Sequence, residues 1–272
     1  MTGDKHADPV VLIPEWRAPA PVHAAMSTRI GGVSTAPCDT LNTGTHVGDA
    51  PTAVAENRHR LRQALQLEAE PAWLDQVHGT TVADLDAAPR TTAPIRADAA
   101  ITRKPGTACV IQVADCMPVL LAASDASVIG AAHAGWRGLA GGVLEATIKA
   151  MQADPAHLHA WMGPTISQRH FEVGDEVRAA FVATDPAAAA AFERNERQRW
   201  QCDLYVLARQ RLAAAGVRHI YGGNWCTYEE RDRFFSFRRD GRCGRMAALI
   251  WLDMRASLFA TTKANTKSQP VS

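Results

Sequence analysis

The sequence has no excess of charge of either sign and no apolar run long enough to cross a membrane. Its 29 Lys and Arg residues nearly balance its 28 Asp and Glu residues, which leaves a formal net charge of +1. This balance excludes a global basic field that would hold a nucleic acid. The most apolar run, Met246–Leu252, is far shorter than the ~20 residues of a membrane-spanning helix. We therefore expect a small molecule as partner, with no nucleic acid and no membrane.

The sequence also lacks a secretory signal and closely spaced cysteine pairs. Asp4, Lys5, His6 and Asp8 lie where a signal peptide needs continuous apolar residues. The six cysteines include no C-x-x-C pair, so neither a zinc ribbon nor a thioredoxin-type centre is indicated. We expect reduced thiols in a cytoplasmic enzyme. Any metal site must then be assembled from segments that are distant in the sequence.

The organisation of the chain predicts one folded domain between two irregular ends. Residues 1–20 are rich in proline and are expected to follow an irregular path, whereas the polar residues 256–272 are expected to form a disordered tail. The domain then spans residues 21–255, with no internal repeat. Nothing in the composition indicates an oligomeric state.

Local patterns predict a mixture of helices and strands within this domain. Helices are expected at residues 49–67, 136–151, 174–183 and 202–215. Short β-rich segments from residue 74 to residue 134 should supply the central sheet, and further strands are expected at 218–221, 234–238 and 246–253. The basic run after residue 230 favours a strand pair that turns at Asp240 and Gly241. This mixed order predicts an α+β or single layered α/β domain and leaves the strand order open.

Three β-rich segments each end in a side chain that could bind a metal. These side chains are His78 in QVHG, Cys116 in ADCMP and His133 in HAGWRG. Zinc favours imidazole and thiolate ligands, and three protein ligands leave a fourth position open for water or substrate. Copper would suit the same donors. Taken singly, each of these residues could instead be a packed or hydrogen-bonded core residue with no metal.

Residues that could bind a substrate or phosphate lie in glycine-containing segments near these three. In HAGWRG, a glycine turn that opens a helix presents free N–H groups to an anion, and Arg137 could strengthen such a site. Arg29 in STRIGGVS and Asn42 in LNTG could fold over it, although surface turns use the same residues. Gln76 precedes the first ligand in QVHG. Glu172 in FEVGDEV is a candidate general acid or base.

The ordered set of motifs resembles the YfiH family, also labelled multicopper polyphenol oxidase or laccase-domain proteins and described as purine nucleoside phosphorylases. The resemblance covers roughly residues 22–252. Its most specific part is ADC followed by HAGWRG. The matching segments are STRIGGVS, LNTGTHVGD, ENR, DQVHG, ADAAIT, ADCMPVLL, AAHAGWRGLAGGVLEATI, MGPTIS, FEVG, CT and FFSFRRDGRCGRMAALIWL.

The resemblance implies a fold, a metal and an activity. The fold would be a four-layer α/β sandwich similar to toxin-type cysteine hydrolases. The cofactor would be zinc, with copper as an alternative metal, held by His78, Cys116 and His133. The implied reactions are phosphorolysis of adenosine, inosine, guanosine and methylthioadenosine, and deamination of adenosine. The sequence has no H-x-E pattern of zinc deaminases, so the proton donor is unassigned.

Other functions use the same residues differently. Cys116 as a thiolate nucleophile with His133 as its base would give a hydrolase for an amide bond, such as one in a cell-wall precursor. A copper-dependent laccase would need clustered histidines, and His157 with His159 form the one H-x-H pair. A non-enzymatic protein with structural zinc would normally supply four ligands.

Overall fold

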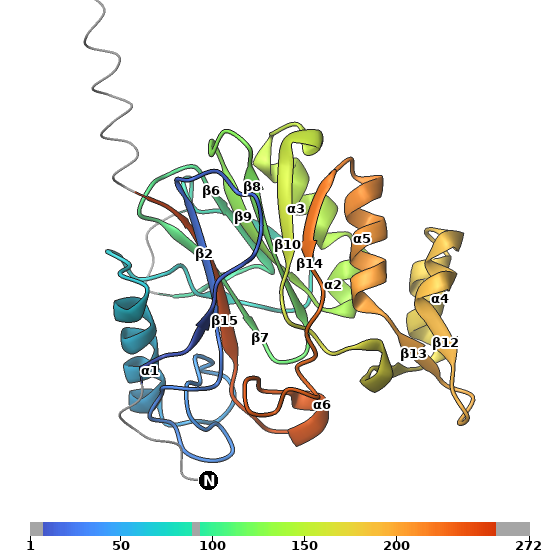
Figure 1. The fold of residues 1–272 in the computed structure, drawn as a ribbon, viewed down its shortest axis with the longest axis horizontal. Helices are drawn as coiled ribbons and strands as arrows, with labels where there is room; N and C mark the ends of the chain where they lie inside the picture. Colours follow the sequence, from blue (N-terminus) through green and yellow to red (C-terminus); the bar gives the residue numbers. More distant parts are fainter. Residues whose placement is uncertain (1–7, 89–92, 254–272) are drawn as a thin grey trace, which may run out of the picture.

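A computed structural model describes residues 8–88 and 93–253, and two β-sheets form the centre of this part of the chain (Figure 1). Residues 8–20 are largely irregular, but Val11–Leu12 forms strand β1 beside β2. The expected disordered tail, residues 256–272, lies outside the described residues. Among the described residues, no helix is both long and apolar enough to cross a membrane.

The first sheet has four antiparallel strands in the order β1-β2-β15-β7. This sheet joins the two ends of the domain, because β15, near the C-terminal end, pairs with β2, near the N-terminal end, and with β7, from the middle of the chain. Its strands are β1, β2 (Val22–Ser27), β7 (Ala108–Val113) and β15 (Met246–Leu252).

The second sheet has six strands in the order β14-β10-β8-β9-β6-β4. Its central pairs are antiparallel, whereas the two edge strands run parallel to their neighbours. Its strands are β4 (Val82–Asp84), β6 (Ala99–Thr102), β8 (Met117–Ala123), β9 (Ile129–Ala134), β10 (Leu158–Met162) and β14 (His219–Gly222).

The β-rich region that was expected to build one central sheet is divided between both sheets. Strand β7 belongs to the first sheet, whereas β4, β6, β8 and β9 belong to the second. Strand β7 is buried on both faces: Ile111 faces the space between the sheets, and Val110 faces the outer side of its own sheet. Buried strands of this kind carry no polar face that would reveal which sheet they join. Two further short strands, β3 (Leu74–Asp75) and β5 (Ile95–Arg96), pair with each other as a separate parallel sheet.

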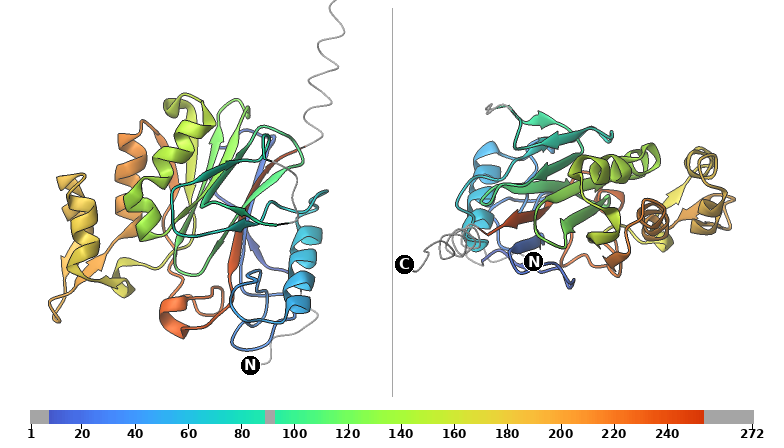
Figure 2. Two further views of the ribbon diagram at one scale, coloured as in Figure 1. Left: turned by 180° about the vertical axis from the view of Figure 1, so that it is seen from behind. Right: turned by 90° about the horizontal axis from the view of Figure 1, so that it is seen from above.

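Three clusters of buried side chains define four layers of structure. Leu61 of helix α1 (Pro51–Ala64) packs against Val110 and Leu249 on the outer face of the first sheet. A second cluster fills the space between the sheets, and a third joins the six-stranded sheet to helices α3 (Val143–Met151) and α5 (Leu204–Ala214). The helices therefore cover opposite outer faces, as the right-hand view of Figure 2 shows. The α/β/β/α order is the four-layer sandwich that the family resemblance implies.

The predicted helices form with small differences at their ends. Helix α1 begins with Pro51 at its first turn and ends before the expected residue 67. The helix expected at 136–151 is broken at Gly142, whose φ of 97° is left-handed, into α2 (Trp136–Gly141) and α3 (Val143–Met151). The two others are α4 (Asp175–Val182) and α5 (Leu204–Ala214).

The prediction of a strand at residues 234–238 is wrong. Phe237–Asp240 instead forms a short helix, α6, and the expected turn at Asp240 and Gly241 is its C-terminal end. Ser236 caps this helix by accepting a hydrogen bond from the Arg239 N–H, and the Arg238 N–H donates to the Asp115 carboxylate at 2.7 Å. The cap by Ser236 and the contact with the distant Asp115 take the place of a partner strand.

A small lobe projects from the six-stranded sheet (Figure 1). It contains helix α4 and a three-stranded antiparallel sheet in the order β11-β13-β12. Its strands are β11 (Glu172–Val173), β12 (Phe192–Arg194) and β13 (Trp200–Cys202).

The described residues also form short 3-10 helices. They are η1 (Pro155–His157), η2 (Gln168–His170) and the longer η3 (Pro186–Ala191).

Candidate metal centre

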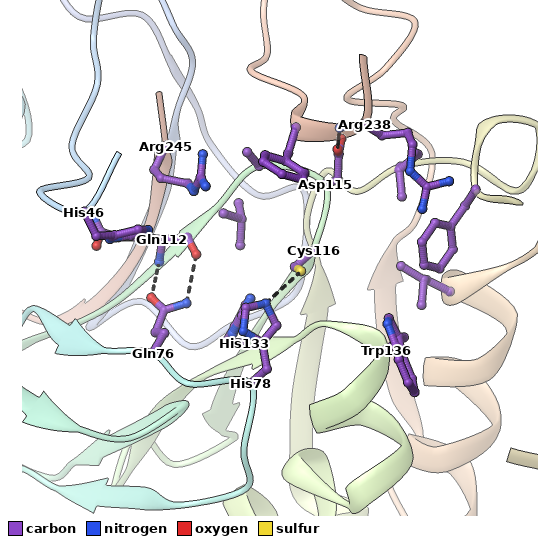
Figure 3. A pocket seen from close by; sticks show the side chains of 16 residues that line it. His46, Gln76, His78, Gln112, Asp115, Cys116, His133, Trp136, Arg238 and Arg245 are labelled. Carbon is purple, nitrogen blue, oxygen red and sulfur yellow. Dashed lines mark hydrogen bonds between the residues drawn. The ribbon is translucent and has the colours of Figure 1, made fainter. Parts of the chain in front are cut away.

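His78, Cys116 and His133 converge at the end of the six-stranded sheet (Figure 3). One ligand atom from each residue lies within 4.8 Å of the other two. His78 lies in the loop after β3, Cys116 precedes β8, and His133 lies within β9. Because β8 and β9 are paired neighbours, their ends bring the thiol and one imidazole together. The fold thus assembles a site from segments that are 38 and 17 residues apart in the sequence.

The carboxylate of Asp98 holds two of these segments in place. It is fully buried and accepts hydrogen bonds from the N–H groups of Val77, His78 and Gly79 at 3.2, 2.8 and 2.6 Å. The same carboxylate contacts His133 Nδ1 at 2.9 Å. This contact directs the other ring nitrogen of His133 away from Asp98 and toward the site. His78 itself has a left-handed φ of 61°, which the three N–H contacts stabilise.

Charge coupling favours ionised forms at the site. Burial opposes ionisation of Asp98, but hydrogen bonds from His133 and Gly79 outweigh it and hold the pKa of this carboxyl below its usual range. Burial also opposes the Cys116 thiolate, yet His133 and His78 lower the pKa of the thiol to about 6. In turn, the pKa of His133 is raised to about 9 against the effect of burial, by the thiolate and by Asp98. Without a metal, the site therefore holds a thiolate beside an imidazolium.

The geometry of the three donors fits a zinc ion. Tetrahedral zinc, with a Zn–S distance of about 2.3 Å and a Zn–N distance of about 2.0–2.1 Å, separates S and N ligands by roughly 3.6 Å. Cys116 Sγ and His78 Nε2 are 3.9 Å apart, which is close to that value. Gly135 leaves the required room, since a Cβ atom there would lie 2.8 Å from the sulfur and 3.1 Å from His78 Cδ2. His78 is exposed and Cys116 partly exposed, so a fourth ligand position can face the cavity.

A cavity of about 380 Å³ opens above the three donors. Cavities of this size hold small organic molecules. One part of its wall is aromatic or aliphatic, and another is polar and basic (Figure 3). Besides the three donors, the lining residues are His46, Gln76, Gln112, Val113, Ala114, Asp115, Trp136, Ile166, Phe171, Leu204, Phe237, Arg238 and Arg245.

Of the four predicted substrate residues, only Gln76 lines the cavity. Its side chain pairs with the backbone of Gln112, donating to the carbonyl at 2.9 Å and accepting from the N–H at 2.7 Å. These bonds tie the His78 loop to β7. Asn42 is fully buried behind the wall, where its Oδ1 accepts a hydrogen bond from the Arg245 N–H at 2.8 Å. Asn42 thus positions a cavity residue.

The two predicted arginines lie outside the cavity wall. Arg29 donates to the carbonyl of Asp39 at 2.9 Å, and its guanidinium lies 4.8 Å from the ring centre of Phe235. Arg137 follows Gly135 at the start of α2, as expected, but its guanidinium stacks over the ring of Trp136. Helix α2 has only six residues, so its N-terminus alone makes a weak anion site.

The other weak candidates also lie away from the cavity. Glu172 accepts hydrogen bonds from Asn195 and Arg197 at the small lobe. The two histidines of the H-x-H pair lie in different elements, because His157 ends η1 and only His159 lies in β10. His159 stacks instead on His219 of the neighbouring strand.

The sequence reasoning missed the cavity residues His46, Arg238 and Arg245, and the buried Asp98 behind the metal-type donors. His46 and Asp98 lie inside the motifs LNTGTHVGD and ADAAIT, so their positions were marked although their roles were not. Burial, together with the charge of Arg245, lowers the pKa of His46, which favours its neutral form. Arg238 and Arg245 lie in the basic run that was expected to be a solvated strand pair. No local pattern distinguishes a basic residue that faces a cavity from one that faces solvent.

Comparisons with known proteins agree over almost the whole domain. Residues 23–253 match the family described as multi-copper polyphenol oxidoreductase laccase. Purine nucleoside phosphorylase YfiH of Escherichia coli is 50% identical over 242 residues, which cover 89% of this chain and 98% of the relative. A purine nucleoside phosphorylase of Haemophilus influenzae is 44% identical over 242 residues, covering 88% and 98% of the two chains.

A solved structure shares both the sequence and the fold. The Neisseria meningitidis protein NMB0706, described as a DUF152 protein, is 47% identical and superposes with a TM-score of 0.86 over 89% of this chain and 99% of its own. YlmD from Geobacillus stearothermophilus is 33% identical, with a TM-score of 0.81 over 86% and 93% of the two chains. On this evidence the chain belongs to the YfiH family, whose domain carries the description multi-copper polyphenol oxidoreductase laccase.

Proposed function

We propose that the protein is a purine nucleoside enzyme that uses zinc for phosphorolysis of adenosine, inosine, guanosine and methylthioadenosine, with deamination of adenosine as a second activity. One observation carries the proposal: three zinc-type donors, His78, Cys116 and His133, converge below a cavity that fits a small molecule. The names of the relatives support the nucleoside as the substrate class. When bound, zinc would supply a Lewis acid that polarises a substrate oxygen or activates water.

The cavity offers two arginines that could hold phosphate. Arg238 and Arg245 both line it, and their guanidinium groups lie 5.2 Å from the Phe171 ring centre and 5.9 Å from the Phe237 ring centre. Guanidinium groups bind phosphate oxygens through two parallel N–H donors. We assign to these two residues the role that the sequence suggested for Arg29 and Arg137. The backbone of Arg245 is fixed on both sides: its N–H donates to Asn42 Oδ1, and its carbonyl accepts from the Thr43 N–H.

The apolar part of the wall suits a purine ring. Trp136, Phe171 and Phe237 line the cavity together with Ile166 and Leu204. Stacking of a base on an aromatic side chain contributes roughly 1–3 kcal/mol and tolerates different bases. This tolerance agrees with activity on adenosine, inosine and guanosine.

Phosphorolysis requires a nucleophile, a sugar and a leaving base in one line. An oxygen of phosphate would form a bond to C1′ of the ribose as the bond from C1′ to the purine nitrogen breaks. The base leaves with the electron pair and takes up a proton, and the products are the free purine and ribose 1-phosphate. Positioning by the two arginines and the aromatic wall would lower the entropic part of the barrier.

His46 is the proton carrier that the cavity offers. Among the described lining residues it is the one imidazole outside the metal-donor group, and its lowered pKa favours the neutral form. The neutral ring can take a proton from the attacking water or from a monoanionic phosphate and then pass it to the leaving purine or ammonia. The carboxylate of Asp115 already accepts from Thr227 and Arg238, and that of Asp98 is committed to His133. We therefore assign to His46 the proton transfer that either reaction needs.

Product analysis tests the proposed function. Purified protein of measured metal content is incubated with adenosine, with and without phosphate, and adenine, inosine and hypoxanthine are separated by chromatography. Adenine that forms only with phosphate supports phosphorolysis, and inosine that forms without phosphate supports deamination. If zinc-loaded protein forms neither product, the nucleoside proposal is wrong.

A second candidate function rests on the contacts around His133. The order Cys116, His133, Asp98 has the arrangement of a nucleophile, its base and the carboxylate that orients the base. Such a triad would hydrolyse an amide bond, for example in a cell-wall precursor, without a metal. Removal of zinc separates the two candidates, because it would abolish phosphorolysis but would free the thiolate for amide hydrolysis.

A copper-dependent laccase is the third candidate, and the family description favours it. One copper could use the same three donors. Within the described residues, only two groups of three donors lie close enough to share an ion, and they are separate. Oxygen consumption with a blue or EPR-active copper species would support this candidate.

A further inference from the structure

A second group of metal-type donors lies outside the cavity. His170, Cys226 and Glu229 each offer one ligand atom, and these atoms lie within 4.8 Å of one another. His170 Nε2 contacts Glu229 Oε1 at 2.8 Å. None of the three lines the cavity above the first site. The group joins the end of η2 to the loop that follows β14.

The surrounding contacts hold the three donors toward one another. Cys226 is 6% exposed, and its sulfur accepts weak hydrogen bonds from the N–H groups of Ser167 and Glu229 at 3.4 and 3.5 Å. The His170 ring stacks on Tyr228, with ring centres 4.2 Å apart and planes 11° apart. Outer contacts of this kind fix the orientation of ligands at metal sites.

A buried polar atom beside the group has no partner. The side-chain oxygen of Ser167 is shielded from solvent and makes no hydrogen bond in the described part of the chain. The backbone N–H of the same residue donates to Cys226 Sγ, so Ser167 is a direct neighbour of the donor group. Unpaired buried hydroxyls cost free energy, and a bound ion or its water would satisfy this one.

We propose that His170, Cys226 and Glu229 form a second zinc site. Nitrogen, sulfur and oxygen donors of this set are those that zinc uses. A zinc ion would displace the hydrogen bond between His170 and Glu229, and the thiol of Cys226 would release its proton to solvent as the sulfur binds the metal. With Zn–N and Zn–O distances of about 2.0–2.1 Å, the N and O atoms must separate to roughly 3.3 Å. A small movement of Glu229, whose side chain is about half exposed, provides this separation.

The second ion would stabilise the wall of the cavity. His170 immediately precedes Phe171, a lining residue, and Cys226 forms a β-bridge with Thr165. The hydroxyl of Thr227 donates to Asp115 at 2.6 Å, and Asp115 is adjacent to Cys116 in the first site. A metal that links residues 170 and 226 therefore ties the segment of Phe171, which lines the cavity, to the segment of Thr227, which contacts the lining residue Asp115. We assign it a structural role.

Cobalt binding in a protein without the first site tests this proposal. Full-length Cys116→Ser protein, stripped of metal and kept reduced, is titrated with Co²⁺ while the thiolate-to-cobalt charge-transfer absorption is recorded. The proposal predicts one equivalent of Co²⁺ with this absorption, displaced by Zn²⁺. Because the variant lacks the first thiolate, the result is independent of the proposed function. Absence of the charge-transfer band would overturn the proposal.

Two further variants identify the ligands. Added to Cys116→Ser, the change His170→Ala should weaken Co²⁺ binding by more than about 100-fold, since even outer contacts change metal affinity 10–100-fold. His170 is partly exposed, so its removal should leave the fold intact. The matched control is His157→Ala, because His157 also pairs with a carboxylate, Asp154, but has no thiol within the pair. Equal binding by both variants would overturn the assignment.

Discussion

At the scale of single residues, Asp98 connects the fold to the metal centre. Its buried carboxylate accepts three N–H donors from the His78 loop and orients His133. The change Asp98→Asn replaces one acceptor oxygen by an N–H donor that faces other donors. We expect the free energy of unfolding to fall by roughly 3 kcal/mol and zinc affinity to fall by about 10–100-fold. Urea unfolding and a zinc titration measure the two effects.

The pH dependence of this effect has a defined sign. Because the folded protein lowers the pKa of Asp98, its carboxylate stabilises the fold above the ordinary carboxyl pKa, and this contribution is lost as the pH falls through the lowered value. The difference in the free energy of unfolding between the wild type and Asp98→Asn should therefore become smaller in acid. An exposed carboxylate, changed as Asp232→Asn, is the control and should alter neither stability nor affinity. If Asp98→Asn changed neither the free energy of unfolding nor the zinc affinity, the proposed role of Asp98 in orienting His133 would be contradicted.

The thiol of Cys116 should be reactive at neutral pH when no metal is bound. Burial opposes its ionisation, but His133 and His78 lower its pKa to about 6. Alkylation of the thiolate by iodoacetamide should therefore be nearly constant between pH 7 and 8 and should halve near pH 6. Mass spectrometry of metal-free protein locates and quantifies the product.

The other cysteines provide an internal control for this reaction. Cys109 and Cys202 are buried, and burial raises the pKa of both thiols. They should stay unmodified while the protein is folded, and zinc should protect Cys116. A rate at Cys116 that still rises about tenfold per pH unit above pH 7 would show an ordinary thiol and would contradict the assigned coupling.

At the scale of elements, the turn between β9 and α2 sets the space for the metal. A Cβ atom at Gly135 would lie 2.8 Å from Cys116 Sγ, so Gly135→Ala must displace the sulfur or the His78 ring. The backbone of Gly135 is extended, and alanine can adopt it. We expect zinc affinity to fall by about tenfold or more with little change in stability. Competition with a metal-binding dye measures this loss.

Gly141→Ala, at the other end of helix α2, is the matched control. Its added Cβ would contact a methyl carbon of Thr80 at 3.1 Å and would meet neither metal ligand. Zinc affinity should stay at the wild-type value. If Gly135→Ala binds zinc as tightly as Gly141→Ala does, the space beside Cys116 is not required for the metal.

Periodicity predicted most elements correctly because their burial pattern is local. The apolar spacing in α5 and the uninterrupted apolar residues of β8 and β9 are visible in the sequence. The break at Gly142 and the helix at Phe237–Asp240 were missed, because they depend on one left-handed glycine and on a cap with a distant carboxylate. Tertiary contacts of this kind override local propensity.

At the scale of the whole molecule, the division of strands between two sheets could not be read from the sequence. Strand β7 is adjacent in sequence to β8, yet it pairs with β15 near the C-terminus. The sequence singled out His78, Cys116 and His133 by their residue types, their neighbouring turns and the resemblance to the YfiH family, whereas their convergence is visible only in the folded chain. Arg238, Arg245 and His46 were missed because only the packing of the two sheets and α6 brings them to the cavity.

The central claim is that His78, Cys116 and His133 carry out nucleoside chemistry with zinc. The most direct measurement is the phosphate-dependent release of base from adenosine by wild-type and Cys116→Ser protein, with metal content and circular dichroism recorded for both. The account predicts that the variant keeps its fold, loses the zinc of the first site and loses at least about 10³-fold in rate, the scale of losing a main electrostatic contribution. Equal rates in two folded proteins would contradict it.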